Sequence, residues 1–377
     1  MNQNKPSFSF EINLIEGCNW ACEYCYEGQD KITGKPHVLN QNPDKLLNAI
    51  HAILNNDWFN VTFGNMHIDF WGGEPSLNLK LMKTVMDEFK HDDRVRYFIY
   101  TNGSRIPELI ETIKDFKDIE TFKGNKLDIQ VSYDGNPIHD LRRVDKKGRP
   151  TSQTTIEGMK LLYDNGFIFK LKSTLMKKDF KRMSAAWDDI YQLRQMFGDR
   201  ITYAPTIDYY SYDLNEQYLK DLEKSMLEIC EKEYHFYKKE GTFLFTWLTT
   251  GAYKRLCGSG KCMAAVDIDG KVYFCHGAIY SGNNTELQFA DIFDTAKLIE
   301  GIKKNHERLT YFVYDDECER CVATACLRCS ITKYFNSNKN SFIDKFYDLK
   351  CQTDLCEYYK LVGKVSRGLM MNIMEDI

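Results

Sequence analysis

Strand and helix signals alternate along roughly the first two hundred residues, and this alternation limits the possible folds more than any other feature. Short runs rich in β-branched and aromatic residues alternate with segments whose apolar residues recur at helical spacing, which is typical of a parallel α/β fold. Six repeats are too few to close an eight-stranded barrel, so we expect an open, partial (β/α)6 barrel of the TIM type. The predicted strands are 8–15, 66–70, 95–100, 127–133, 167–175 and 201–207.

The rest of the chain follows a different pattern. A long helix is predicted from Leu214 to Lys239, and Gly241 ends it. Beyond Gly251 cysteines become frequent and the strand–helix alternation fades. We therefore expect an α/β chain of three parts. The predicted parts are a partial barrel over 1–210, a helical linker over 211–250 and a mixed, cysteine-rich domain over 251–377.

Composition excludes several classes of function and points to metal. The net charge of −4 gives no basic face for nucleic acid, and no apolar run approaches the roughly 18 residues of a membrane span. The chain has thirteen cysteines but opens without an apolar signal region. In a long chain without a signal peptide, many cysteines indicate metal binding in the cytoplasm more than disulfides.

Cys18, Cys22 and Cys25 form a CxxxCxxC pattern, with Tyr24 just before the third cysteine. Three thiolates can hold three corners of a [4Fe–4S] cluster and leave its fourth iron without a protein ligand. An open coordination position is what distinguishes a catalytic metal site from a structural one. The alternative is a zinc knuckle, but the local spacing offers no fourth ligand for it.

This pattern resembles that of the radical S-adenosylmethionine (SAM) enzymes. The resemblance implies that the open iron binds the amino and carboxylate groups of SAM. An electron from the cluster then cleaves the sulfonium and releases a 5′-deoxyadenosyl radical. Tyr24 would pack near the adenine.

Gly72, Gly73 and Glu74 follow the second predicted strand in the sequence Trp-Gly-Gly-Glu-Pro. Two glycines let the backbone approach a ligand closely, and the adjacent carboxylate can accept hydrogen bonds from an ammonium group. Gly-Gly-Glu-Pro alone is a common turn. In this position it resembles the motif that binds the amino group of SAM in the radical SAM family.

Polar residues also end the third and fourth strands, where parallel sheets bind ligands. Turn formation alone accounts for the Asn-Gly and Asp-Gly pairs there. The family resemblance instead implies that Asn102 and Ser132 contact the ribose or carboxylate of SAM, with Asp134 as a further contact. The segment SYDGNPIHDLRR resembles the corresponding segment of peptide-modifying members, in which Arg143 or Arg142 would reach the carboxylate.

Nine cysteines lie from position 257 onward, and their spacing resembles the SPASM domain, which holds two auxiliary [4Fe–4S] clusters. The resemblance implies that one cluster takes Cys257, Cys262, Cys275 and Cys329. The other takes Cys318, Cys321, Cys326 and Cys356, with Cys351 as the alternative last ligand. Cys326 and Cys329 are exchangeable between the two sets. A zinc ribbon is the other possibility, but its two CxxC pairs usually stand roughly 15–20 residues apart and not four.

The relatives that share this architecture act on polypeptides. We expect a maturase that installs a thioether or carbon–carbon cross-link in a ribosomally made precursor peptide. The first alternative is an anaerobic sulfatase-maturating enzyme that oxidises Cys or Ser to formylglycine. In that class an Asp follows the cysteine corresponding to Cys275, whereas here His276 does, as a candidate base or as a polar group beside the cluster. The second alternative is an iron–sulfur electron carrier, which needs no SAM pocket.

Three [4Fe–4S] clusters and SAM are the expected cofactors. The expected partners are the precursor peptide and a flavodoxin- or ferredoxin-type reductant. We expect the chain to bind neither nucleic acid nor a membrane. Only seventeen residues precede Cys18, so we expect no fused recognition domain at the N-terminus. Leader binding would then use the barrel, the SPASM domain or a separate recognition protein.

Overall fold

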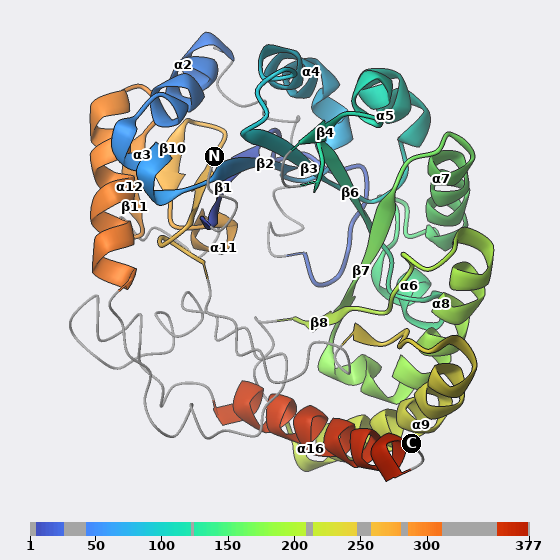
Figure 1. Ribbon diagram of the computed structural model, residues 1–377. Coiled ribbons are helices and arrows are strands. Elements are labelled where there is room, and N and C mark those ends of the chain that lie inside the picture. The colour runs from blue at the N-terminus through green and yellow to red at the C-terminus, as the bar shows by residue number, and fades with distance from the viewer. Residues whose placement is uncertain are drawn as a thin grey trace. The chain divides into compact units, whose positions relative to one another are not determined.

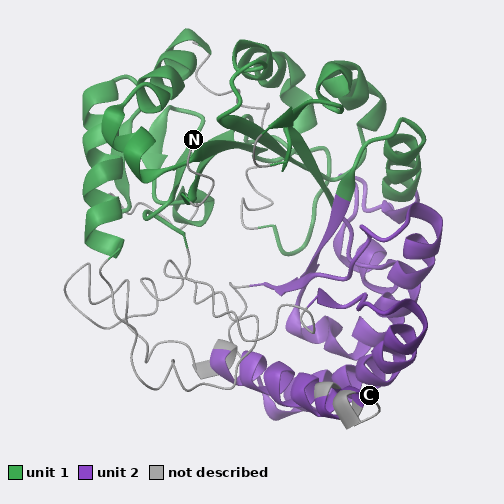
Figure 2. Ribbon diagram, viewed as in Figure 1, with its two compact units in different colours: residues 1–131, 154–169, 258–313 green, residues 132–153, 170–257, 314–377 purple. Residues whose placement is uncertain are grey.

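The chain forms two compact units, coloured separately in Figure 2. The first unit comprises residues 1–131, 154–169 and 258–313. The second comprises residues 132–153, 170–257 and 314–377. Within them, the computed structural model describes residues 5–25, 43–121, 124–208, 214–246, 258–279, 286–310 and 353–375.

The first unit is built on a sheet whose strands follow the order β11-β10-β9-β1-β2-β3-β6 (Figure 1). The neighbours from β9 through β1, β2 and β3 to β6 are parallel, and β10 is antiparallel to β9 and β11. The strands are β1 (Ser7–Asn13), β2 (Asn65–Trp71), β3 (Val95–Thr101), β6 (Leu127–Ser132), β9 (Met263–Val266), β10 (Lys271–Tyr273) and β11 (Gln288–Asp291). A small hairpin of β4 (Glu120–Thr121) and β5 (Gly124–Asn125) stands apart from this sheet.

Helices connect these parallel strands and cover one face of the sheet. Phe8 of β1 is buried, and its ring lies 5.5 Å from that of Phe59 and 5.1 Å from that of Phe63. The opposite face of the same strands carries polar residues, among them Glu11 and Asp69. The helices are α2 (Pro43–Leu54), α3 (Asp57–Thr62), η1 (Pro75–Asn78), α4 (Leu79–Glu88), α5 (Ile106–Ile113), η2 (Lys114–Phe116), α7 (Ser152–Asp164) and α12 (Thr295–Thr310). The short helix α11 (His276–Ile279) instead begins at the polar face, where His276 meets Glu11.

The cysteine-rich part of the chain extends this sheet, which the sequence did not predict. β9 pairs in parallel with β1, so that Ala265 lies opposite Glu11. The N–H of Ser9 also donates to the carbonyl of Cys262 at 2.9 Å. A strand more than two hundred and fifty positions later in the chain therefore binds directly to the edge of the first predicted strand.

The second unit contains the remaining helices and the parallel pair β7–β8. The predicted long helix is present as α9, which Asn215 caps through its side chain and Gly241 ends in a left-handed conformation with φ of +67°. Helix α16 packs against α9. The elements are α6 (Asn136–Arg142), β7 (Phe169–Leu175), η3 (Lys177–Arg182), α8 (Met183–Phe197), β8 (Pro205–Ile207), α9 (Glu216–Glu240) and α16 (Thr353–Glu375).

The predicted fold class is confirmed as a mixed α/β chain with a parallel sheet that, in the described ranges, does not close into a barrel. The sixth predicted strand is shorter than expected, because only 205–207 of the run 201–207 is strand. Within the described residues, none of the helices combines the length and the apolar character needed to cross a membrane.

Candidate cofactor site

The three cysteines of the CxxxCxxC pattern lie on the segment that follows β1, and all three are half-buried. The N–H of Cys25 donates to the carbonyl of Cys22 at 3.1 Å, which turns the segment back on itself. The N–H of Trp20 points at the sulfur of Cys18 at 3.4 Å, and the Trp20 side chain is buried beneath the segment. Local hydrogen bonds and one buried anchor therefore hold the triad in place.

Gly72 and Gly73 bring the end of β2 against this cysteine-bearing segment. The N–H of Gly73 donates to the carbonyl of Ile15 at 2.7 Å, and the N–H of Glu74 donates to the carbonyl of Gly17 at 3.0 Å. A Cβ on Gly73 would lie 2.1 Å from the carbonyl oxygen of Gly17, and one on Gly72 would lie 2.4 Å from that of Ile15. In the structure, the two glycines thus permit close contact between two parts of the backbone.

Glu74 lies directly beside this contact and is almost fully buried, with 1% of its surface exposed. One carboxylate oxygen accepts from the hydroxyl of Thr101 at 2.9 Å and from the N–H of Ser76 at 3.1 Å. The other accepts from the N–H of Asn102 at 2.7 Å. Burial raises the pKa of Glu74, and these hydrogen bonds oppose that rise. A carboxylate has about four acceptor positions, so the oxygen bonded to Asn102 retains capacity for another donor.

Asn102 links the end of β3 to the triad. Its side-chain amide donates to the Oδ1 of Asn19 at 2.9 Å and lies 3.8 Å from the sulfur of Cys18. Asn19 in turn donates to the hydroxyl of Ser104 at 2.8 Å. Asn102 was predicted from the sequence. Its supporting residues Asn19 and Ser104 were not, and neither was Thr101, which supports Glu74. The sequence Thr-Asn-Gly-Ser after a strand was the available signal, since short polar side chains there hydrogen-bond to nearby backbone.

The donor chemistry of this region fits an iron–sulfur cluster. Burial, and next the charge of Glu74, raise the pKa of the Cys18 thiol, so its thiolate needs a compensating positive charge such as a metal supplies. Cys18, Cys22 and Cys25 offer three sulfur ligands from one short segment, the ligand type that such clusters use. In the described part of the chain, no three potential metal ligands already converge on one point.

The other predicted SAM contacts belong to the second unit. Asp134 is fully buried and accepts a bidentate pair of hydrogen bonds from Arg143, at 2.9 and 3.1 Å. Arg142 forms its own bidentate pair with Asp179. Ser132 is half-buried at the end of β6. Each predicted arginine therefore already holds a carboxylate within the protein, which the sequence did not indicate.

Three of the predicted auxiliary-cluster cysteines are described. Cys262 precedes β9 and burial raises its pKa, whereas Cys275 is buried at the end of the β10 hairpin. Cys356 is half-buried on α16 in the second unit. The predicted ligands outside the described residues are Cys257, Cys318, Cys321, Cys326, Cys329 and Cys351.

His276, the candidate base, begins α11 in the first unit. Two of its nitrogens meet Glu11 of β1: the backbone N–H and the ring Nδ1 each lie 2.8 Å from one carboxylate oxygen. Its ring lies 5.3 Å from that of Trp71, the residue directly before Gly72. The unit therefore places His276 beside the end of β2. Tyr24 is half-buried between Cys22 and Cys25.

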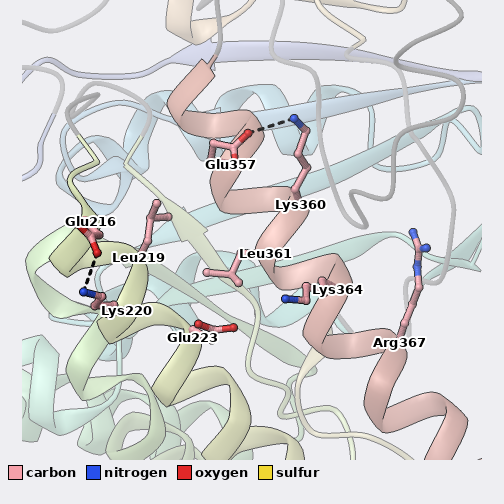
Figure 3. A pocket seen from close by; sticks show the side chains of 9 residues that line it. All are labelled: Glu216, Leu219, Lys220, Glu223, Glu357, Lys360, Leu361, Lys364 and Arg367. Atoms are coloured by element: carbon pink, nitrogen blue, oxygen red, sulfur yellow. Dashed lines mark hydrogen bonds and ion pairs between the residues drawn. The ribbon is translucent and has the colours of Figure 1, made fainter.

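A groove of about 540 Å³ lies within the second unit between α9 and α16 (Figure 3). Leu219 and Leu361 are among its lining residues, and ion pairs line its sides, including Glu216 with Lys220 at 2.7 Å and Glu357 with Lys360 at 3.1 Å. None of the predicted site residues lines it.

Two family models match the chain. The model described as Radical SAM superfamily matches residues 12–183. The model described as SPASM, an iron-sulfur cluster-binding domain, matches residues 257–322. The first match contains the triad and every predicted SAM contact, and the second contains Cys262, Cys275 and His276. The resemblance inferred from the motifs is confirmed, and the two domains imply the binding of SAM and of iron–sulfur clusters.

Three curated relatives share parts of this sequence. An uncharacterized protein of Methanocaldococcus jannaschii is 27% identical over 258 residues, which cover 62% of this chain and 79% of that protein. The radical SAM cyclopropyl synthase TigE of Paramaledivibacter caminithermalis is 22% identical over 389 residues, covering 94% of this chain and 72% of TigE. The serine-type anaerobic sulfatase-maturating enzyme of Bacteroides thetaiotaomicron is 26% identical over 169 residues, covering 43% of this chain and 38% of that enzyme.

Solved structures of the anaerobic sulfatase-maturating enzyme anSMEcpe share the fold. The form with bound AdoMet has a TM-score of 0.71 and 19% identity, and the match covers 99% of this chain and 96% of that one. The form with AdoMet and the Kp18Cys peptide has a TM-score of 0.70 and 20% identity, with 99% and 100% covered. The expected arrangement of a partial barrel with a SPASM domain is thus shared along nearly the whole chain.

Proposed function

Because the chain carries a radical SAM domain followed by a SPASM domain, we propose that it is a peptide maturase. Using a 5′-deoxyadenosyl radical, it would install a thioether or carbon–carbon cross-link in a ribosomally synthesised precursor peptide. The observation that carries the radical step is the buried network in which Glu74 and Asn102 meet the segment of Cys18. The similarity to a cyclopropyl synthase along 94% of the chain supports bond formation between carbon atoms.

The residues of the first unit have distinct tasks in this proposal. A [4Fe–4S] cluster held by the triad supplies, with SAM bound, the electron that releases the radical. Glu74 is held by three donors, and its remaining acceptor capacity would receive the amino group of SAM. Asn102 positions the Cys18 segment through Asn19 and would contact SAM beside it. Tyr24 would pack against the adenine.

In the second unit, Arg143 and Asp134 form one buried pair at the end of β6. Their bidentate geometry fixes the guanidinium plane, so that Arg143 would meet the carboxylate of SAM in one orientation. Ser132, at the end of the same strand, would donate a hydrogen bond from its hydroxyl to the cofactor. We assign Arg143 rather than Arg142 because its partner Asp134 is itself a predicted SAM contact, whereas Arg142 pairs with Asp179.

The SPASM domain would carry two auxiliary clusters, and the chain therefore three in all. The proposed ligand sets are those that the family resemblance implies, with Cys262 and Cys275 in the same set and Cys356 in the other. We retain the proposed boundaries of 1–210, 211–250 and 251–377. His276 would take or position a proton beside the cluster that Cys275 binds. A flavodoxin- or ferredoxin-type protein would supply electrons in the cytoplasm. The leader would bind to the barrel, to the SPASM domain or to a separate recognition protein.

A sulfatase-type maturase is the second candidate, and one observation favours it. The serine-type enzyme of Bacteroides thetaiotaomicron is 26% identical over 169 residues of this chain. The residue after Cys275 argues for the first candidate, since His276 stands where the sulfatase class carries the Asp that acts as its base.

Mass spectrometry separates the two candidates. The reconstituted protein is incubated without oxygen with SAM, a reductant and the short peptides encoded beside its gene. A cross-link makes the product lighter by about two hydrogens per bond, and the linkage survives reduction and thiol alkylation, which reverse a disulfide. Formylglycine instead gives an aldehyde that a hydrazide reagent captures. An aldehyde on a sulfatase-derived peptide, with no cross-link on any neighbouring peptide, would reverse the order of the candidates.

His276→Ala tests the proposed base in the same assay. The substitution leaves every predicted SAM contact in place, so it should impair peptide modification more than 5′-deoxyadenosine release. The proposed role of His276 would be contradicted if peptide modification and 5′-deoxyadenosine release fell equally, or if neither of them fell.

A further inference from the structure

Glu11 has a buried carboxylate to which the sequence analysis and the proposed function assign no role. It lies on the face of β1 opposite to the buried Phe10 and Ile12, and 2% of its surface is exposed. Burying a carboxylate is costly unless hydrogen-bond donors compensate its charge. Its neighbour on β9 is Ala265, whose side chain has no donor. Its neighbour on β2 is Asp69, which accepts a hydrogen bond from Ser9. Neither neighbour supplies the donors that Glu11 needs.

The donors come from the start of α11. One oxygen of Glu11 accepts the backbone N–H of His276, and the other meets the Nδ1 of the same residue, both at 2.8 Å. Two bonds from one carboxylate to the backbone and the side chain of one residue fix both its position and the rotation of its ring. The ring of Trp71, 5.3 Å away, limits the same imidazole from another side.

We propose that Glu11 is the positioning residue that fixes the segment of Cys275 and His276 against the first strand of the radical SAM domain. This inference rests on the proposed function, because it assigns the auxiliary-cluster segment its place beside the site of radical chemistry. Cys275 is the immediate neighbour of the held residue and is itself buried. The backbone bond from Ser9 to Cys262 ties a second predicted ligand of the same cluster to the same strand.

The inference also defines the direction of the imidazole. Nδ1 is the ring nitrogen directed at Glu11, so the contact fixes which edge of the imidazole faces β1. The His276 side chain is 43% exposed although Glu11 is not, so the held residue presents an accessible group from a buried anchor. Glu11 thus sets the position and the orientation of the His276 ring, and it acts through His276 and not by contact with a substrate.

Three variants of the full-length, cluster-loaded protein test this inference. Glu11→Ala removes both acceptors, and Glu11→Gln keeps the shape but only one acceptor oxygen. Ser7→Ala is the matched control, because Ser7 lies on the same strand as Glu11 and its replacement removes a 2.7 Å hydrogen bond to Asn65 of β2. If Glu11→Ala does not fold, the comparison of Glu11→Gln with the control decides.

The first measurement is hydrogen exchange of residues 274–279 under anaerobic conditions. Losing a hydrogen bond to a charged group should speed exchange of the His276 amide by about ten- to a hundredfold in Glu11→Ala. Glu11→Gln should show a smaller increase and Ser7→Ala none. Unchanged exchange in both Glu11 variants would overturn the inference.

The second measurement is the ratio of 5′-deoxyadenosine released to peptide modified, read together with the electron paramagnetic resonance of the auxiliary clusters. Glu11→Ala should raise the ratio severalfold and alter the auxiliary signal, while the SAM-dependent signal of the triad cluster stays unchanged. A merely structural role would lower radical release and modification together, and that result would refute positioning. If the unaltered protein releases no 5′-deoxyadenosine, the proposed function fails, and the exchange measurement still decides the role of Glu11.

Discussion

Replacing Gly73 by alanine should open the contact between the end of β2 and the cysteine-bearing segment. The added Cβ would lie 2.1 Å from the carbonyl oxygen of Gly17 and 2.4 Å from its carbonyl carbon. Both are backbone atoms, so no side-chain rotation relieves the overlap. Normal contact between non-bonded atoms requires about 3.5 Å, so the two segments must separate by roughly 1.4 Å.

That separation breaks the two hydrogen bonds that join the segments. The bonds from Gly73 to Ile15 at 2.7 Å and from Glu74 to Gly17 at 3.0 Å would both exceed the range of a hydrogen bond. Each buried bond contributes about 1 kcal/mol, and leaving its groups unsatisfied costs more, so we expect a loss of about 2–4 kcal/mol in the free energy of unfolding. Glu74 moves with its backbone, so SAM affinity should fall by at least about tenfold.

Urea unfolding followed by circular dichroism measures the first effect, and calorimetric titration of the anaerobic, reconstituted protein with SAM measures the second. Gly368→Ala is the matched control, since a Cβ there meets nothing within 4 Å. In the helix α16, alanine should stabilise by up to about 1 kcal/mol relative to glycine. If Gly73→Ala unfolds at the same urea concentration as the unaltered protein and binds SAM equally well, the close contact has no energetic importance and our reasoning is wrong.

Three further predictions concern the triad, the buried ion pair and a buried carboxylate. Replacing Cys18, Cys22 and Cys25 together by alanine should remove about four iron atoms per chain and abolish 5′-deoxyadenosine formation, as iron analysis and chromatography would show. Arg143→Ala should destabilise the protein by about 3–5 kcal/mol in urea unfolding, because it leaves the carboxylate of its partner buried without a counter-charge. Burial raises the pKa of Glu233 from its usual 4.5 to about 7, so the folded state binds more protons than the unfolded state between these values. Stability should therefore fall as pH rises from about 4.5 to about 7, by up to about 3 kcal/mol, and Glu233→Gln should flatten this slope.

The predicted elements agree with the structure where a local pattern determines them. The run 95–100 alternates between buried and half-buried residues, and the strand extends only one residue further, to Thr101. The run 201–207 has an equally regular pattern, but only residues 205–207 form a strand. Tyr203 there exchanges backbone hydrogen bonds with Leu244 and Thr246 at 2.7 and 2.9 Å. A competing partner some forty residues away was not visible in a local pattern.

The candidate site shows the same difference between features set by neighbouring residues and contacts between distant ones. Spacing and residue type were enough to indicate the triad and Glu74, because their chemistry depends on residues close together in sequence. They did not reveal that Gly73 contacts Gly17 or that Glu11 contacts His276, since these partners are 56 and 265 positions apart. Such contacts depend on which strands become neighbours, and the pairing of β9 with β1 was not predictable from a run of four short apolar residues.

β1 and the segment after it contact both parts of the site that the sequence treated as separate domains. The segment after the strand accepts hydrogen bonds from the backbone of Gly73 and Glu74. The middle of the strand contacts Cys262 through Ser9 and His276 through Glu11. The cofactor motif and the auxiliary-cluster segment are therefore held by a single strand and the turn that follows it. A displacement of this strand must change both at once, whereas a change at the end of β3 reaches the cofactor side through Asn102 and leaves the Glu11 contacts intact. Separate effects on radical release and on peptide modification are thus expected from substitutions of side chains on β1, and combined effects from substitutions that move its backbone.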